Sequence, residues 1–117
     1  MDASKKVLDS LALDIRQKLI ESASNEKKLY CGDIAISGDD LYMSGLSDVL
    51  SKISRYEYKN GRPLLSAIVV QKENELPNTE FFLLCDSLKT TQSLEEMQSD
   101  CFDFWSKEEN KQKYLTI

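Results

Sequence analysis

The chain has 117 residues and a formal charge of −5, with 41% hydrophobic and 30% charged side chains. This is the length of one domain, and the composition is too apolar for a disordered chain and too mixed for a fibre. No apolar run approaches the roughly 20 residues of a membrane helix, and no secretory h-region follows the start of the chain, so we expect one globular, cytoplasmic domain over residues 1–117.

The first part of the chain predicts one helix and a loop. Residues 4–24 carry apolar side chains three and four positions apart, with Leu8, Leu11, Ile15 and Leu19 on the buried stripe. Arg16 falls among the residues that we assign to the solvated faces. Glycines and aspartates between Tyr30 and Gly45 then indicate a loop, with one short helical turn at Asp33 to Ile36.

A second helix is predicted from Leu46 to about Lys59, with Ser44 or Gly45 as its N-cap. After it, Leu64 to Val70 is nearly all aliphatic, which predicts the central strand of a small sheet, buried on both faces. Ser66 within it is either a hydrogen-bonded core hydroxyl or a polar group in a pocket. The polar segment 71–79 is expected to form an exposed turn or wing.

The last part of the chain predicts two helices. The apolar block from Phe81 to Leu88 fits a strand or a short helix, and we favour the helix because Asn78 or Thr79 can cap it. The pattern Ser93-Leu94-Glu95-Glu96 is a capping box, and the helix that it begins is predicted to reach about Lys111. The predicted fold class is α+β, with three or four helices around a small sheet, in one version a winged-helix-like arrangement.

Cysteine and histidine content restricts the chemistry. The chain has no histidine, and its three cysteines, Cys31, Cys85 and Cys101, are far apart. Imidazole-dependent catalytic sites are therefore excluded, and neither spacing nor ligand type suggests zinc. We expect reduced thiols, with Cys85 and Cys101 in the core and Cys31 the most exposed. We interpret the protein as non-enzymatic, without a cofactor or a metal ion.

Four cations at intervals of three, four and three form what we call the basic strip. It consists of Lys52, Arg55, Lys59 and Arg62. With Lys72 in the following turn, this strip could contact the phosphates of a nucleic acid. The simpler interpretation is a solvated helix face, because the negative net charge repels a polyanion. Arg62, which Pro63 holds extended, either clamps a carboxylate or phosphate or pairs with a carboxylate of the last helix.

The last helix is acidic and carries aromatic residues on more than one face. Trp105 belongs to its buried stripe, whereas Phe102 and Phe104 point elsewhere. Either the helix is covered on two sides or part of it forms an interface. We predict that Phe102, Phe104, Asp103 and Glu96 bind a partner, which is an unknown protein or a second copy of the chain.

The stretch Asn60-Gly61-Arg62-Pro63-Leu64-Leu65-Ser66-Ala67-Ile68-Val69-Val70, followed by Lys72, Pro77 and Phe81-Phe82, resembles a group of small bacterial proteins of unassigned function. Their recurrent pattern is G-x-P-x-L-(S/T)-x-L-V-V-x-K-x-T-G-x-P-G-x-G-F. The similarity covers about the middle third of the chain and implies no activity. This chain lacks the glycines of the pattern between Glu75 and Glu80.

A second resemblance concerns the order of elements. The stretch Tyr30-Cys31-Gly32-Asp33-Ile34-Ala35, then a helix, an aliphatic strand and a polar turn, is similar to the winged-helix domain of alkylguanine-DNA alkyltransferases. Those enzymes need a Pro-Cys-His-Arg site, and the corresponding stretch here is Pro63-Leu64-Leu65-Ser66, so alkyl transfer is not expected. The resemblance implies winged-helix architecture and DNA contact through Lys52, Arg55 and Lys59, which is our alternative to protein binding.

Overall fold

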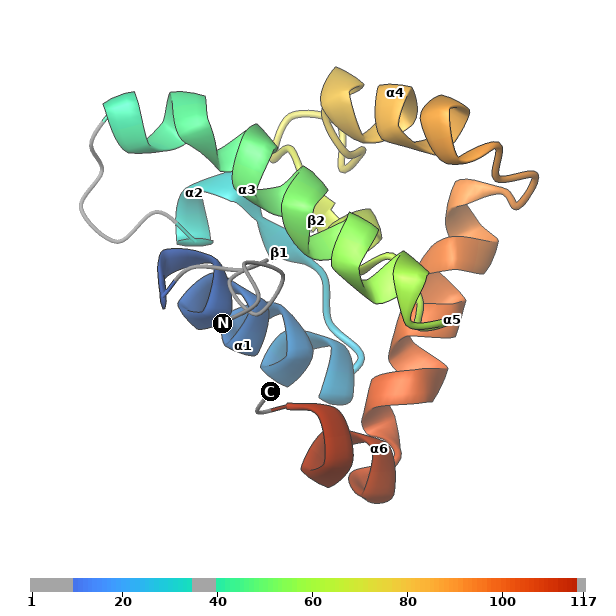
Figure 1. Cartoon of the computed structure of the whole chain (residues 1–117). Helices are drawn as coiled ribbons and strands as arrows, with labels where there is room; N and C mark the ends of the chain where they lie inside the picture. The colour runs from blue at the N-terminus through green and yellow to red at the C-terminus, as the bar shows by residue number, and fades with distance from the viewer. Residues whose placement is uncertain (1–9, 35–39, 116–117) are drawn as a thin grey trace, which may run out of the picture.

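The computed structural model describes residues 10–34 and 40–115 of the chain (Figure 1). These residues form six α-helices: α1 (Ser10–Ser24), α2 (Cys31–Ile34), α3 (Asp40–Lys59), α4 (Thr79–Leu88), α5 (Leu94–Ser106) and α6 (Glu108–Tyr114). Two short strands, β1 (Leu29–Tyr30) and β2 (Val69–Val70), and the 3-10 helix η2 (Leu65–Ile68) complete the described part. This arrangement is compatible with a small α+β fold, although it has more helices than predicted. None of the described helices is long and apolar enough to cross a membrane.

The segment 64–70 runs through the centre of the molecule. Its 3-10 helix η2 packs against α1, α3 and α5, which surround it in Figure 1. No residue of this segment exposes more than 4% of its surface, so the predicted burial is confirmed. The predicted strand is correct only for Val69 and Val70, because residues 65–68 form η2 instead.

Side chains from neighbouring helices explain why η2 needs no sheet partner. Ser54 Oγ of α3 accepts a hydrogen bond from Ser66 N at 3.0 Å. From α5, Gln98 Nε2 donates to Ala67 O at 3.0 Å, and Cys101 Sγ donates to Leu64 O at 3.1 Å. These contacts satisfy backbone groups that a strand ladder would otherwise pair. Ser66 Oγ lies 2.6 Å from Ser54 Oγ, so Ser66 is a hydrogen-bonded core hydroxyl.

The two strands pair in parallel, with Leu29 opposite Val69 and Tyr30 opposite Val70. Two neighbouring parallel strands require a crossover connection, and here the chain from α2 through α3 forms it. After β2, Gln71 N donates to Leu76 O at 2.9 Å and closes a turn whose residues 72–76 are exposed. The predicted exposed turn is therefore confirmed for residues 72–76, whereas Pro77 is buried and Thr79 begins the next helix, α4.

The predicted helix starts are partly confirmed. Asn78 Oδ1 accepts a hydrogen bond from Phe81 N at 3.3 Å at the start of α4. The capping box of α5 is complete, since Ser93 Oγ accepts from Glu96 N at 3.1 Å and Glu96 Oε1 accepts from Ser93 N at 2.9 Å. The prediction that Ser44 or Gly45 caps the second helix is wrong, because α3 already begins at Asp40.

The end of α5 and the position of α2 differ from the prediction. Helix α5 ends at Ser106 rather than near Lys111, and α6 follows after an extended Lys107. Asn110 Nδ2 donates to Phe104 O at 2.9 Å, which satisfies a carbonyl near the end of α5 and stabilises the break. The short helix predicted at Asp33 to Ile36 occurs as α2, two residues earlier. Residues 4–9 of the first predicted helix and Ile36 lie outside the described residues.

Candidate functional site

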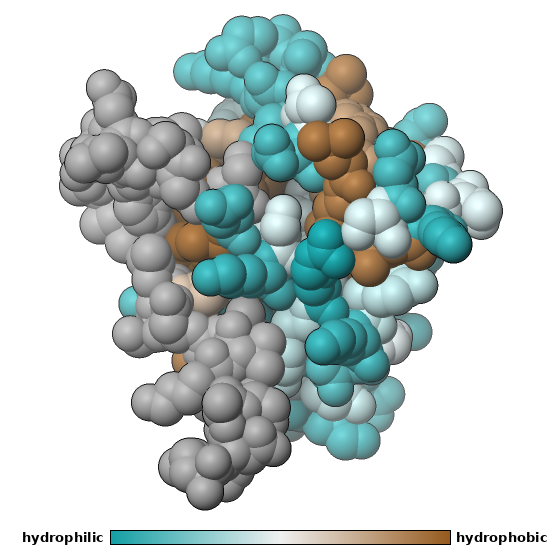
Figure 2. Space-filling model, turned by 45° about the horizontal axis from the view of Figure 1, so that its top comes forward, coloured by the Kyte–Doolittle hydropathy of each residue, from teal (hydrophilic) through white to brown (hydrophobic). Residues whose placement is uncertain are grey.

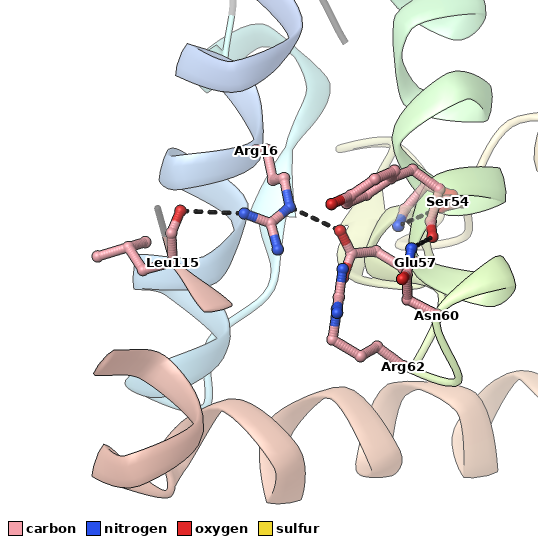
Figure 3. A network of polar contacts seen from close by, with 8 residues as sticks. Arg16, Ser54, Glu57, Asn60, Arg62 and Leu115 are labelled. Atoms are coloured by element: carbon pink, nitrogen blue, oxygen red, sulfur yellow. Dashed lines mark hydrogen bonds and ion pairs between the residues drawn. The ribbon is translucent and has the colours of Figure 1, made fainter. Parts of the chain in front are cut away.

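Three charged side chains are buried together between α1, the end of α3 and the loop after it (Figure 3). Glu57 Oε2 accepts from Arg16 Nε at 2.6 Å, and Glu57 Oε1 accepts from Arg62 Nε at 2.6 Å. The side chains of Arg16, Glu57 and Arg62 are 0%, 0% and 7% exposed. Because two guanidinium groups share one carboxylate, this buried arginine–glutamate cluster has one positive charge in excess.

Aromatic rings and the C-terminal segment enclose the cluster. The guanidinium carbon of Arg62 lies 4.8 Å from the ring centre of Tyr114 and 5.3 Å from that of Tyr56. The guanidinium carbon of Arg16 lies 5.7 Å from the ring centre of Trp105, and its Nη1 donates to Leu115 O at 3.0 Å. Such cation–π contacts replace part of the solvation that burial removes.

Three buried nitrogens in this region have no hydrogen-bond acceptor among the residues that the structure describes. They are Nη2 of Arg16, Nη2 of Arg62 and Nε1 of Trp105. All three are donors, and an unsatisfied buried donor costs about 1–3 kcal/mol.

Arg62 also lines an open groove of about 470 Å³ that we call the α3–α5 groove. The end of α3, residues 61–64, residues 90 and 92, and α5 form its walls. Its lining side chains include Tyr58, Arg62, Met97, Asp100, Asp103 and Phe104. Met97, Asp100 and Phe104 follow one another at intervals of three and four, so they lie on one face of α5. The groove thus combines apolar walls with charged groups.

Two of the four predicted partner-binding residues meet at this groove. Phe104 and Asp103 line it, whereas Phe102 and Glu96 do not. Phe102 lies two positions from Phe104, about 200° around the helix. Both rings pack against the main core, the buried cluster that includes Ile15, Leu19 and Trp105, but only Phe104 also lines the groove. Glu96 contributes its carboxylate to the capping box.

Phe104 is only partly available to a partner. Its ring packs edge-on against Trp105, with 4.8 Å between centroids, and stacks on Tyr114 of α6 at 5.9 Å. Helix α5 is therefore covered on a second side by α6, which is one of the two alternatives that the aromatic pattern left open.

The prediction that the basic strip forms one solvated face is wrong for Arg62. The chain turns at Gly61, whose φ is 73°, and Arg62 N donates to Glu57 O at 2.9 Å. This turn ends the helical spacing and directs the Arg62 side chain to Glu57 of α3 instead of the last helix. The remaining cations, Lys52, Arg55 and Lys59, are exposed, as is Lys72. Arg55 Nη2 donates to Ser87 Oγ of α4 at 3.1 Å.

The assignment of Arg16 to a solvated face is also wrong, since the residue is fully buried. Arg16 lies four positions from both Ala12 and Ile20, which are buried as well. That spacing was a usable signal, because residues four apart share a helix face. Glu57 gave the same signal, since it lies four positions after Ile53 and seven after Leu50, which are buried on α3. Its two partners, which come from α1 and from the turn after α3, could not be read from that spacing.

A separate apolar surface lies on and before α4. Phe82, Leu83 and Leu76 are 41%, 55% and 45% exposed, and none of them lines the α3–α5 groove. Figure 2, in which the upper side of Figure 1 comes forward, shows hydrophobic residues exposed between hydrophilic ones. The opposite face of α4, with Phe81, Leu84 and Cys85, is buried.

The three cysteines are free thiols in different surroundings. Cys85 and Cys101 are buried, as predicted, and Cys31 is half-buried. Burial raises the pKa of the Cys31 thiol, and the negative charge of Glu73 adds to this effect. Burial also raises the pKa of the Cys85 and Cys101 thiols. None of the three environments therefore favours the nucleophilic thiolate.

We expect a disulfide reagent such as DTNB to modify only Cys31 in the folded protein near neutral pH, and more slowly than it modifies free cysteine. The raised pKa lowers the thiolate fraction at that pH, and burial protects the other two thiols. The number of modified thiols, measured with and without denaturant, tests this. Cys31→Ser should abolish labelling of the folded protein, and fast labelling of Cys101 before unfolding would contradict its placement in the core.

Comparisons of the chain with models of known protein families, with curated proteins and with solved structures gave no match. Its function is therefore inferred from the chemistry of its own surface.

Proposed function

We propose that the protein is a non-enzymatic module that binds another protein through the α3–α5 groove. The observation that carries this proposal is the meeting of Phe104 and Asp103 of α5 with Tyr58 of α3 around one groove. Tyr58 is 47% exposed although it is a large aromatic residue. Aromatic side chains in a concave surface, next to charged groups at its edge, are typical of protein interfaces.

The size and lining of the groove favour a short segment of a partner. Its volume of about 470 Å³ accommodates a few side chains rather than a whole helix face. Met97 and Phe104 offer apolar contact within it, and Asp100, Asp103 and Lys107 lie among its charged residues. Charged groups around an apolar contact select partners through charge complementarity.

Site-specific photocrosslinking tests this proposal. A benzophenone side chain in place of Tyr58 is expected to capture a partner in cells that express the protein naturally, and Asp103→Lys should lower the yield about tenfold, since like charges across an interface are unfavourable. The mass of the product distinguishes a different protein from a second copy of the chain.

Asp14→Lys is the matched control, because it makes the same charge change at an exposed residue of α1 that does not line the groove. The proposal is wrong if this control lowers the yield as much as Asp103→Lys does. A benzophenone placed at exposed Gln17 of α1 should give no product that depends on Asp103.

Nucleic-acid binding by a winged-helix-like domain is the alternative function. The exposure of Lys52, Arg55 and Lys59 on one face of α3 favours it, and Lys72 adds a cation in the turn after β2. This alternative agrees with the resemblance to the winged-helix domain of alkylguanine-DNA alkyltransferases. The burial of Arg62 removes one of its predicted contacts.

Duplex DNA binding measured over a range of salt concentrations tests the alternative. If these cations contact phosphates, Lys52→Glu combined with Arg55→Glu should abolish binding and its dependence on salt. Binding that is absent in the unchanged protein, or that survives in the double variant, would eliminate this function.

A further inference from the structure

Helix α6 is attached to the molecule less firmly than the helix before it. None of its seven residues is buried, and it follows α5 through the extended Lys107. Its ion pair with α1, between Lys111 and Glu21, is partly exposed, and such pairs contribute little to stability. In contrast, α5 places Cys101 and Trp105 in the core. Isolated helices shorter than about 12–15 residues are marginal in water, so α6 depends on its contacts with the rest of the molecule.

The C-terminal end of α6 covers the two guanidinium groups of the buried arginine–glutamate cluster. The ring centre of Tyr114 lies 4.8 Å from the guanidinium carbon of Arg62. Leu115 O, directly after α6, accepts a hydrogen bond from Arg16 Nη1 at 3.0 Å (Figure 3). With α6 in this position, the side chains of Arg16 and Arg62 are 0% and 7% exposed. Movement of α6 away from the cluster would therefore admit water to both groups.

The position of α6 also leaves polar groups of the cluster without partners. Arg16 and Arg62 share the one carboxylate of Glu57, so one positive charge is in excess. The Nη2 atom of each arginine has no acceptor among the described residues. Burial of charges and donors without partners is unfavourable, and water would remove this penalty when α6 moves away. The hydration of the cluster therefore offsets part of the contact energy that α6 loses.

We propose that α6 is a latch that opens as one unit about Lys107 while the rest of the fold stays intact. Closed, it seals the arginine–glutamate cluster from water, and open, it makes Arg16 and Arg62 accessible. Opening also uncovers the face of the Phe104 ring on which Tyr114 stacks, with 5.9 Å between the centroids. Because Phe104 lines the α3–α5 groove, the latch changes one wall of that groove.

Chemical modification of the unchanged full chain tests the latch. Phenylglyoxal reacts with accessible guanidinium groups, and Arg55, the third arginine of the chain, is exposed and serves as the reference for the reagent. Cys101 is fully buried, so its reaction with DTNB reports global unfolding. Peptide mass spectrometry measures each rate. Low urea concentrations should hardly change the rates of Arg16 and Arg62 but should raise that of Cys101, because the effect of urea scales with the surface exposed.

Substitutions at two places separate opening of the latch from global unfolding. Tyr114→Ala removes the stacked ring and should raise the modification rates of the two buried arginines about tenfold. Ile34→Val trims the main core in α2, far from α6 in Figure 1, and should raise the Cys101 rate about fivefold without changing the arginine rates. Phe82→Ala is the matched control for Tyr114→Ala, since it removes an exposed ring of α4 and should leave the arginine rates unchanged.

Two results would overturn the proposal. If Arg16 and Arg62 react in proportion to Cys101, both in urea and in Ile34→Val, the cluster opens only when the whole protein unfolds. If they react as fast as Arg55 in the unchanged protein, α6 does not seal the cluster. All of these rates are measured on the free chain, so they are independent of the proposed protein-binding function.

Discussion

Replacing Glu57 by alanine is expected to lower the free energy of unfolding by about 3–5 kcal/mol, because it leaves two buried guanidinium groups without their shared carboxylate. Small domains are stable by only about 5–15 kcal/mol, so this variant should be close to unfolding. Urea denaturation followed by circular dichroism measures the change. Glu80→Ala is the control, since it removes an exposed carboxylate of α4 and should change stability by about 0.5 kcal/mol or less.

A triple substitution distinguishes unpaired charge from lost packing. Arg16→Met, Glu57→Leu and Arg62→Met together remove all three charges while keeping similar volumes. Apolar replacement of a whole buried ionic cluster is often neutral or stabilising, so the triple variant should be more stable than Glu57→Ala. A triple variant that is less stable than the single one would show that the cluster contributes net favourable energy.

Trp105→Ala is expected to lower the free energy of unfolding by about 3–5 kcal/mol through the cavity that it creates. Trp105 is fully buried and belongs to the main core. Trp105→Phe should cost about half as much or less, because it keeps an aromatic ring and its indole N–H has no acceptor among the described residues. Thermal unfolding followed by circular dichroism suits both variants, since Trp105 is the single tryptophan of the chain.

Equal destabilisation by the two tryptophan variants would contradict this expectation. If Trp105→Phe destabilises the protein as much as Trp105→Ala does, the indole N–H makes a hydrogen bond that the described residues do not supply. The loss of volume alone would then fail to explain the result.

The sequence predicted those features that depend on interactions between residues close together in the chain. The Asn78 cap and the Ser93–Glu96 capping box each involve residues within three positions of one another, and both are present. The buried stripe of Met97, Cys101 and Trp105 was predictable because helical spacing alone defines it.

Interactions between distant residues account for what the sequence did not predict. Residues 65–68 are as apolar as a central strand, but Ser54 and Gln98 bond to their backbone and favour η2. Arg62 has the spacing of an exposed cation, but Glu57 draws it into the core.

The candidate site was predicted in part. Asp103 and Phe104 were found from the acidic and aromatic character of the last helix, and both line the groove. The opposite wall, with Tyr58 from α3, depends on how α3 and α5 are placed, which no local pattern encodes.

The packing of α1 against α5 has a consequence for protein synthesis. These helices are the first and the last but one in the described chain, and α6 adds an ion pair between Lys111 and Glu21 at 2.7 Å. The part of α1 that α5 covers therefore stays uncovered until residues 94–106 have left the ribosome, whereas α3 and η2 contact α1 and emerge earlier. Non-local contacts of this kind form late, so the nascent chain exposes an apolar segment to chaperones until α5 has emerged.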